Sequence, residues 1–95
     1  MRRAAKTDAN QTAVIVTLRA IGASVQSLAA LGKGCPDLLV SHRGTLYLLE
    51  VKDGAKPKSA RKLNAIQRQW HDGWRGTVYV VETPEQALAV IRGGV

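Results

Sequence analysis

The sequence predicts an α/β fold with a mixed central sheet flanked by helices, in the order helix, three strands, helix, strand, helix. Segments with apolar residues at helical spacing alternate with short apolar segments bounded by turn residues. The strand segments 38–40 and 46–51 are apolar on both faces, which is typical of a sheet covered by helices on both sides. The 95 residues, 45% of them hydrophobic, suffice for a single domain over 1–95 with one modest core.

The first helix is expected to start at Asp8 or Asn10, either of which can cap it, and to end near Gly22. A short strand over 24–28 and a loop over 29–35 follow. The spacing of apolar residues predicts that the buried stripe of the helix consists of Gln11, Val14, Ile15, Leu18 and Ile21.

The strands 38–40 and 46–51 are expected to form a hairpin, with Arg43 and Gly44 as its two-residue turn. In that register His42 lies opposite Thr45, and residues 37 and 50 also lie opposite each other. The first three strands follow one another directly, so we expect them to be antiparallel neighbours.

The segment 53–62 is expected to be a loop, because it contains glycine, proline and serine. Asn64 is expected to cap a helix that continues to about Gly73. A strand over 77–81 then joins the sheet by a crossover, and Thr83-Pro84-Glu85 begins the last helix. The predicted inward side of the middle helix consists of Ile66, Gln67, Trp70 and Trp74, and that of the last helix of Ala87, Leu88 and Ile91.

The charge balance points to a polyanionic partner. Fourteen Lys and Arg residues against seven Asp and Glu residues leave a net charge of +7, which excludes an acid-rich calcium buffer. The single Cys35 excludes an internal disulfide and a cysteine-based zinc cage, and fits a reducing cytoplasm. The apolar runs are far shorter than the roughly 20 residues that cross a bilayer. A cytoplasmic protein without a membrane partner is therefore expected.

Basic residues gather in two places that could follow a DNA backbone. One is the flexible arm 1–7, with Arg2 and Arg3. Such runs are more often only a solvated surface, and that alternative stays open. No residue pattern indicates that base edges are read. The second place is the loop before the middle helix, with Lys56, Lys58, Arg61 and Lys62.

Asp37, Glu50 and Lys52 are expected on the same face of the sheet, because side chains alternate along a strand. Two carboxylates facing each other among leucine and valine would repel, unless a cation lies between them or one is protonated. Mg²⁺ typically takes one or two carboxylates together with water and phosphate. The alternative is that Glu50 and Lys52 are a solvated edge pair. His42 and His71 have no metal-ligand partner at a suitable spacing and are expected to be surface or packing residues.

The motifs Gly34-Cys35-Pro36-Asp37 and Leu49-Glu50-Val51-Lys52, followed by Gln67 and Trp70, resemble the PD-(D/E)XK nuclease superfamily. More closely, the chain is similar to the small stand-alone VRR-NUC proteins of phages and bacteria. The resemblance implies a restriction-endonuclease-like fold and a DNA endonuclease that depends on Mg²⁺ or Mn²⁺. Small relatives resemble Holliday-junction resolvases, which implies a homodimer that cuts branched DNA.

The resemblance also implies a role for each site residue. Asp37 and Glu50 would hold the metal together with the backbone carbonyl of Val51, while Lys52 acts near the attacking water and Gln67 orients the site. Related nucleases commonly carry a glutamate where this chain has Gln11, whose amide can ligate a metal but brings no charge. The alternative function is therefore a nucleic-acid-binding module of the same fold with weak or no catalysis.

Overall fold

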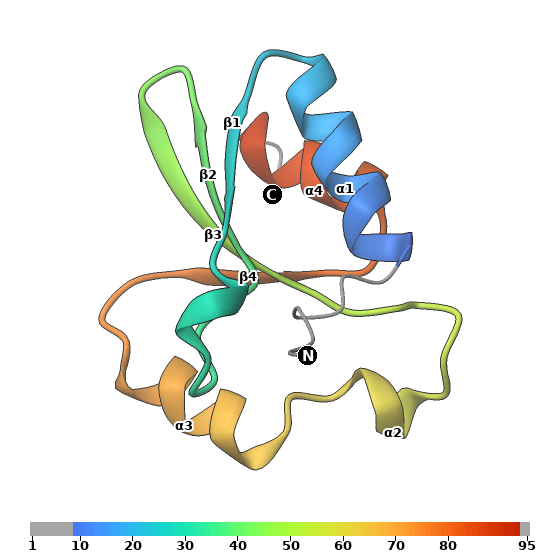
Figure 1. Ribbon diagram of the computed structural model, residues 1–95, viewed down its shortest axis with the longest axis vertical. Helices are drawn as coiled ribbons and strands as arrows, with labels where there is room; N and C mark the ends of the chain where they lie inside the picture. The colour runs from blue at the N-terminus through green and yellow to red at the C-terminus, as the bar shows by residue number, and fades with distance from the viewer. Residues whose placement is uncertain (1–8, 94–95) are drawn as a thin grey trace, which may run out of the picture.

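The computed structural model of the chain describes residues 9–93, and its elements follow the predicted order with two additions (Figure 1). The additions are a 3-10 turn and a one-turn helix. The prediction that 53–62 is entirely loop is therefore wrong, because Pro57 holds the backbone at φ −58° directly before a helical turn. The elements are α1 (Ala9–Ala20), β1 (Ser24–Ser27), η1 (Ala29–Leu31), β2 (Leu38–His42), β3 (Thr45–Val51), α2 (Lys58–Arg61), α3 (Ala65–Gly73), β4 (Val78–Val81) and α4 (Pro84–Ile91).

The four strands form one mixed sheet in the order β1-β2-β3-β4. The first three are antiparallel neighbours and β4 runs parallel to β3, which confirms both the predicted meander and the crossover. The predicted hairpin register is also confirmed, with His42 opposite Thr45. Arg43 and Gly44 both have positive φ angles, 52° and 81°, as a two-residue turn between twisted strands requires.

The hydrophobic core lies between one face of the sheet and the pair α1 and α4, which lie side by side on the same side of it (Figure 1). Burial of these apolar side chains is the main force that holds the layers together. Gln11, Ile15 and Ile21 of the predicted α1 stripe are only half-buried. The buried apolar side chains are Val14, Leu18, Ala23, Val25, Leu38, Val40, Leu49, Val51, Val81, Ala87, Val90 and Ile91.

The other face of the sheet is covered only at one end, where α3 lies. Away from α3, Leu46 is 67% exposed and Val80 is 46% exposed, so helices flank the sheet without closing this face. We call this surface the open face. Because side chains alternate along each strand, its members outside the covered end are Ser24, Gln26, Leu39, Ser41, Leu46, Leu48, Val78 and Val80.

The helix α3 lies on the molecule without entering the core. The prediction that its apolar side is buried is wrong, since none of its residues is buried and Ile66 is 60% exposed. Trp70 instead stacks on Trp74, with ring centroids 4.7 Å apart. With nine residues between two loops, α3 reaches only the end of the sheet.

The first turn of α1 is fastened to the ends of β3 and β4. Asn10 lies inside the helix, which begins at Ala9, so Asn10 does not cap it; Asp8 lies outside the described residues. The Asn10 amide instead donates to the carbonyls of Lys52 at 2.7 Å and Glu82 at 3.0 Å. Among residues 9–93, no helix has the length and apolar character needed to span a membrane.

Candidate functional site

The charged residues singled out in the sequence meet where β2 begins and β3 ends, on the sheet face opposite the core. Asp37 directly precedes β2, while Glu50 lies near the end of β3 and Lys52 follows it. Leu49 and Val51 point into the core, so Glu50 between them points to the other face, under α3.

The carboxylate of Asp37 connects the two strands beyond the end of their ladder. Its Oδ2 accepts a hydrogen bond from the backbone N–H of Val51 at 2.7 Å. On the other side, the carbonyl of Asp37 accepts from the N–H of Leu28 at 2.8 Å. Asp37 is therefore held by backbone on both sides, which fixes its carboxylate next to Glu50.

Glu50 is almost completely buried, with 2% of its surface exposed. Its Oε2 accepts from the Gln67 amide at 2.9 Å and lies 3.6 Å from the ammonium of Lys52. Its Oε1 is buried and has no hydrogen-bond partner among the described residues. A buried carboxylate oxygen without a partner is costly, which makes Oε1 a candidate ligand for a cation.

The electrostatics of Glu50 point to the same conclusion. Burial raises its pKa from an ordinary value of 4.5 to about 7; the charge of Asp37 and a hydrogen bond with it also raise the pKa, against the lowering effect of Lys52. Lys52 therefore does not fully compensate the negative charge of the two carboxylates, and a further cation beside them would be stabilising. Two carboxylates and an unpartnered buried oxygen fit Mg²⁺ or Mn²⁺, which prefer hard oxygen ligands.

Residues 9–93 contain no group of three or more His, Cys, Asp or Glu side chains that could hold a metal ion. The carboxylates of Asp37 and Glu50 would therefore need backbone, amide or water oxygens beside them. Val51 has its side chain in the core and its N–H bound to Asp37, which places its peptide group within the site. Gln11 is half-buried on α1, one residue from Asn10, whose amide binds the carbonyl of Lys52.

Gln67 connects the two charged side chains of β3 with α3. Its Oε1 accepts from the Lys52 ammonium at 2.8 Å, while its amide nitrogen donates to Glu50. The same Oε1 accepts from the N–H of Asn64 at 3.0 Å, and the Asn64 side chain accepts from the N–H of Gln67 at 2.9 Å. This capping box makes the start of α3 and the position of the Gln67 side chain one structural unit.

Next to the carboxylates lies a hollow of about 320 Å³ between α3 and the loop before β2. Gly34 in this loop has φ +83°, and a Cβ there would collide with the backbone of Ile66, including its carbonyl oxygen. Only glycine lets the loop lie so close to α3. The hollow is lined by Leu28, Ala29, Gly32, Lys33, Gly34, Cys35, Asp37, Asn64, Ile66 and Gln67.

Cys35 lies in this hollow and is half-buried. Burial raises the pKa of its thiol, and the charges of Glu50 and Asp37 raise it further. A thiol with a raised pKa stays protonated, so Cys35 is poorly suited to be a nucleophile.

His71, which was expected to be a surface or packing residue, lies close enough to the site to feel the charge of Lys52. Burial lowers its pKa, as does the charge of Lys52, while Asp72 has the opposite effect. Its Nε2 is buried without a hydrogen-bond partner among the described residues. The available signal was its spacing, because His71 is four residues after Gln67 and so lies on the same side of α3.

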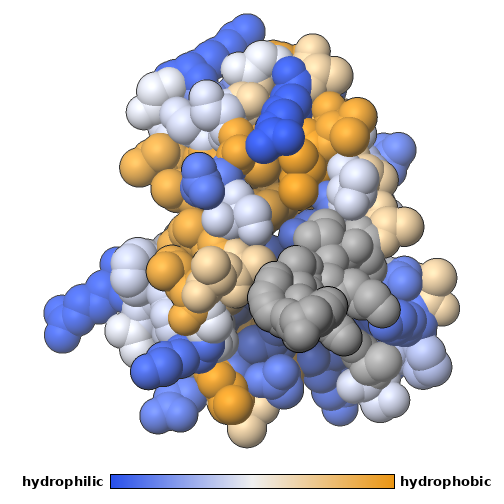
Figure 2. Space-filling view, in the orientation of Figure 1, coloured by the Kyte–Doolittle hydropathy of each residue, from blue (hydrophilic) through white to orange (hydrophobic). Residues whose placement is uncertain are grey.

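The basic residues of the predicted DNA-binding loop lie in and around α2, and three of them, Lys56, Lys58 and Lys62, are exposed. Arg61 is half-buried and forms an ion pair with Glu82 at 3.3 Å. Hydrophilic side chains dominate the lower half of the molecule in Figure 2, where α2 and α3 lie. The arm with Arg2 and Arg3 lies outside the described residues.

A comparison with solved structures finds one described as a VRR_NUC domain. The two chains share 31% sequence identity and superpose with a TM-score of 0.59, over 86% of this chain and 89% of that chain. No family model matches the sequence, and no curated protein matches it.

Proposed function

Because this chain belongs to the VRR-NUC family, we propose that it is a DNA endonuclease that uses Mg²⁺ or Mn²⁺ to hydrolyse phosphodiester bonds. The membership supports a nuclease-type function. The chemistry of the site supports the metal, the DNA substrate and the role of each residue that we propose. The lone cysteine fits a reducing compartment, so we also propose that the protein acts in the cytoplasm.

The observation that carries the proposal is the buried carboxylate of Glu50. One of its oxygens has no hydrogen-bond partner among the described residues, and the carboxylate of Asp37 lies against it. If Glu50 formed only a structural ion pair with Lys52, this oxygen would stay buried without a partner, which costs free energy of folding. A divalent cation between the two carboxylates offsets both the repulsion and the missing partner.

The proposed roles follow from the contacts of each side chain. Asp37 and Glu50 hold the metal, with the carbonyl of Val51 beside them. When bound, such a metal lowers the pKa of a water molecule and neutralises charge on the phosphate. Lys52 presents its ammonium next to Glu50, where it can orient that water or stabilise negative charge on the phosphate. Gln67 holds Lys52 and Glu50 at a fixed separation.

Gln11 is proposed as a weak, uncharged ligand or as a hydrogen-bond partner of metal-bound water. Because it contributes no charge, the site has two carboxylates where a glutamate would have made three. This favours a single tightly held metal ion over two.

The basic surface around α2 is proposed to bind the DNA backbone without reading sequence. Lys56, Lys58 and Lys62 are exposed and can contact phosphates directly. Arg61, which is paired with Glu82, is expected to shape this surface more than to contact DNA itself. Arg2 and Arg3 are proposed to add contacts from the N-terminal arm.

We further propose that the protein acts as a homodimer on branched DNA such as Holliday junctions. The support is the open face of the sheet, where the described strand side chains outside the site are all uncharged. A polyanion has no reason to bind such a face, whereas two copies of a chain with a net charge of +7 repel each other least where they meet through an uncharged face. Two sites in one dimer suit paired cuts.

The test of the proposed function is cleavage of a four-way junction and of a linear duplex of the same sequence, with Mg²⁺, Mn²⁺ or EDTA. We expect metal-dependent cleavage that is faster on the junction. Lys52→Ala should lower the rate about 100-fold or more, since it removes a charge from the reacting centre. Arg75→Ala, which removes an exposed cation, is the control and should retain the rate.

Two outcomes would count against the enzyme. If the folded protein cleaves no substrate with either metal, the proposal is wrong. If it binds DNA with equal affinity before and after Lys52→Ala but cleaves nothing, the binding-module alternative holds, and Gln11 in place of an acid is the feature that favours it.

A further inference from the structure

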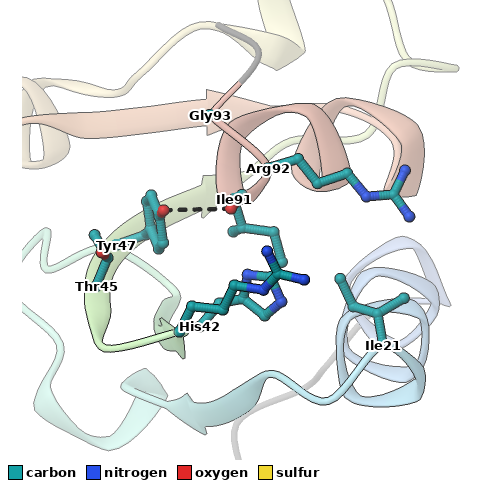
Figure 3. Close-up of a pocket in the computed structure, with 8 residues that line it drawn as sticks. Ile21, His42, Thr45, Tyr47, Ile91, Arg92 and Gly93 are labelled. Carbon is teal, nitrogen blue, oxygen red and sulfur yellow. Dashed lines mark hydrogen bonds between the residues drawn. The ribbon is translucent and has the colours of Figure 1, made fainter.

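Besides the basic surface around α2, the molecule has a second basic site, a pocket at the other end of β3 from the carboxylates, which we call the second basic pocket. It lies between the tip of the β2–β3 hairpin and the C-terminal ends of α1 and α4 (Figure 3). Its volume is about 480 Å³, within the range of sites that hold small ligands or groups. The function proposed above does not use this pocket.

The chemistry of the pocket is cationic. Arg43 and Arg92 contribute guanidinium groups and His42 an imidazole, while none of the lining residues is acidic. Thr45 and Tyr47 add hydroxyl groups. Guanidinium groups bind the oxygens of phosphates and carboxylates in a bidentate geometry, so this combination suits an anion. Two guanidinium groups together with an imidazole and two hydroxyls can serve the several oxygens of a phosphate.

Arg43 occupies a backbone conformation that its turn does not favour for arginine. Its φ angle is +52°, in the left-handed region where asparagine, aspartate or glycine is preferred at a two-residue hairpin turn. Nothing in the hairpin itself requires an arginine there. Unfavourable conformations that persist at one position are concentrated at functional sites, and the guanidinium group is what this residue supplies.

The walls of the pocket are joined by a hydrogen bond. The hydroxyl of Tyr47 donates to the carbonyl of Ile91 at 3.3 Å, which connects the hairpin to the end of α4. In Figure 3, Tyr47 and Thr45 lie on one side of the pocket and Ile21 on the other, with Ile91 between them. The pocket is therefore largely formed before any ligand binds.

We propose that this pocket binds a phosphate of the DNA backbone at a distance from the bond that is cut. This inference rests on the proposed nuclease function and adds a second DNA contact to it. Five residues along β3 separate Thr45 from Glu50, which corresponds to about 17 Å along the strand. Because this number is odd, Thr45 points to the face that carries α1 and α4 while Glu50 points to the opposite face, so DNA reaches both only around the edge of the sheet and about 17 Å is a minimum. DNA that reaches both places must therefore extend about five base pairs or more past the cut, since each base-pair step is about 3.4 Å.

The experiment compares binding of a duplex of about 4 base pairs, closed by a hairpin loop, with one of about 20, without divalent metal, over a range of salt concentrations. The test protein combines Arg43→Asn with Arg92→Gln. On the long duplex we expect about tenfold weaker binding and a salt slope smaller by about one, for the one phosphate contact that is lost. On the short duplex, which cannot span both places, the variant should bind as the wild type does.

Folding can be separated from binding in this design. Asparagine suits the left-handed turn position, so Arg43→Asn alone should keep or raise the midpoint of thermal unfolding while it weakens binding of the long duplex. The double change Arg43→Lys with Arg92→Lys keeps the charge and should recover part of the affinity.

Several results would overturn the inference. Equal losses on both duplexes would indicate a general effect of charge, and no loss on either would mean that the pocket does not contact DNA. If calorimetry shows that a deoxynucleoside monophosphate binds and the variant abolishes only that binding, the ligand is a free nucleotide and not DNA.

The experiments distinguish a pocket that does not bind DNA from a protein that is not a nuclease. A wild-type protein that neither binds nor cleaves DNA would refute the nuclease itself. A wild-type protein that cleaves, with a variant that binds the long duplex equally well, would refute the pocket alone.

Discussion

At the scale of single residues, the neutral amide of Gln67 organises the charged groups of the site. An amide offers a donor and an acceptor at once, so the same side chain satisfies the anion of Glu50 and the cation of Lys52. A carboxylate at this position would add a third negative charge beside Asp37, and an ammonium would repel Lys52. Gln67 is therefore a positioning residue for Glu50 and Lys52, the groups that we propose act on the metal and the phosphate.

Replacement of Gln67 by alanine should lower cleavage about 10- to 100-fold and weaken metal binding, because residues that orient metal ligands have effects of this size. Metal titration of the cleavage rate measures both changes. Gln69→Ala, at an exposed position of the same helix, is the matched control. Equal rates for the two variants would show that the contacts of Gln67 are only structural.

The raised pKa of Glu50 predicts how the metal-free protein responds to pH. Its pKa is about 7 in the folded chain against an ordinary 4.5, so the folded state binds the proton more tightly. The stability from this proton is fully present below about pH 4.5 and is lost as pH rises through 7. The loss is at most about 3 kcal/mol.

Urea unfolding in EDTA at pH 5 and pH 8 measures this effect. We expect wild type to lose stability between these values relative to Glu50→Gln, which cannot titrate, and Mg²⁺ to restore wild type at pH 8. Because the pKa of His71 is lowered from 6.5, protonation of His71 reduces the stability of the folded state only below pH 6.5, and it does so in both proteins. An unchanged stability difference between the two proteins at pH 5 and pH 8 would contradict the prediction.

At the scale of elements, the site depends on the close approach of the loop before β2 to the start of α3. Gly34 allows this approach, and the Asn64 capping box fixes the turn that carries Gln67. The helix has no buried residue to hold it otherwise. These local contacts therefore do for α3 what core packing does for α1 and α4.

Gly34→Ala should displace α3, because the new Cβ would lie 2.8 Å from the carbonyl carbon of Ile66. We expect it to cost about 1–2 kcal/mol more than Gly22→Ala and to lower cleavage as well. Gly22 is the matched control because its φ is also positive, +93°, and a Cβ there meets nothing within 4 Å. Urea unfolding and the cleavage assay measure the two effects, and equal behaviour of the variants would refute the close approach.

At the scale of the whole molecule, the sheet divides the protein into a closed side and an open one. The closed side holds α1, α4 and the core, while the open face carries exposed Leu46 and Val80. The carboxylates lie at one end of the open face and the second basic pocket at the far end of β3. A dimer through the open face would place two nuclease sites in one assembly.

Sedimentation measures the proposed dimer directly. At micromolar concentration we expect wild type to be dimeric and Leu46→Asp to be monomeric, because it introduces a charge at the most exposed leucine of the uncharged open face. Val16→Asp changes a residue of similar exposure, 61%, on α1 and should stay dimeric. A monomeric wild type would remove the paired-cut proposal and leave the single site intact.

Local pattern by itself determined the order of the main elements, the hairpin register and the group of residues 37, 50 and 52, to which the family resemblance added residue 67. The register could be predicted because a two-residue turn at Arg43 and Gly44 leaves one pairing, and alternation then places Glu50 and Lys52 on one face. The Asn64 cap could be predicted because capping depends on neighbours in the sequence.

The tertiary structure decided what depends on contacts between distant segments. The spacing of Ile66 and Trp70 is amphipathic, yet whether that side of α3 is buried depends on how far the crossover carries the helix along the sheet. Asn10 could have been a cap, but its amide binds two strand ends that only folding brings near. The pocket around Arg43 and Arg92 joins residues 49 positions apart, and no local pattern encodes such a distance.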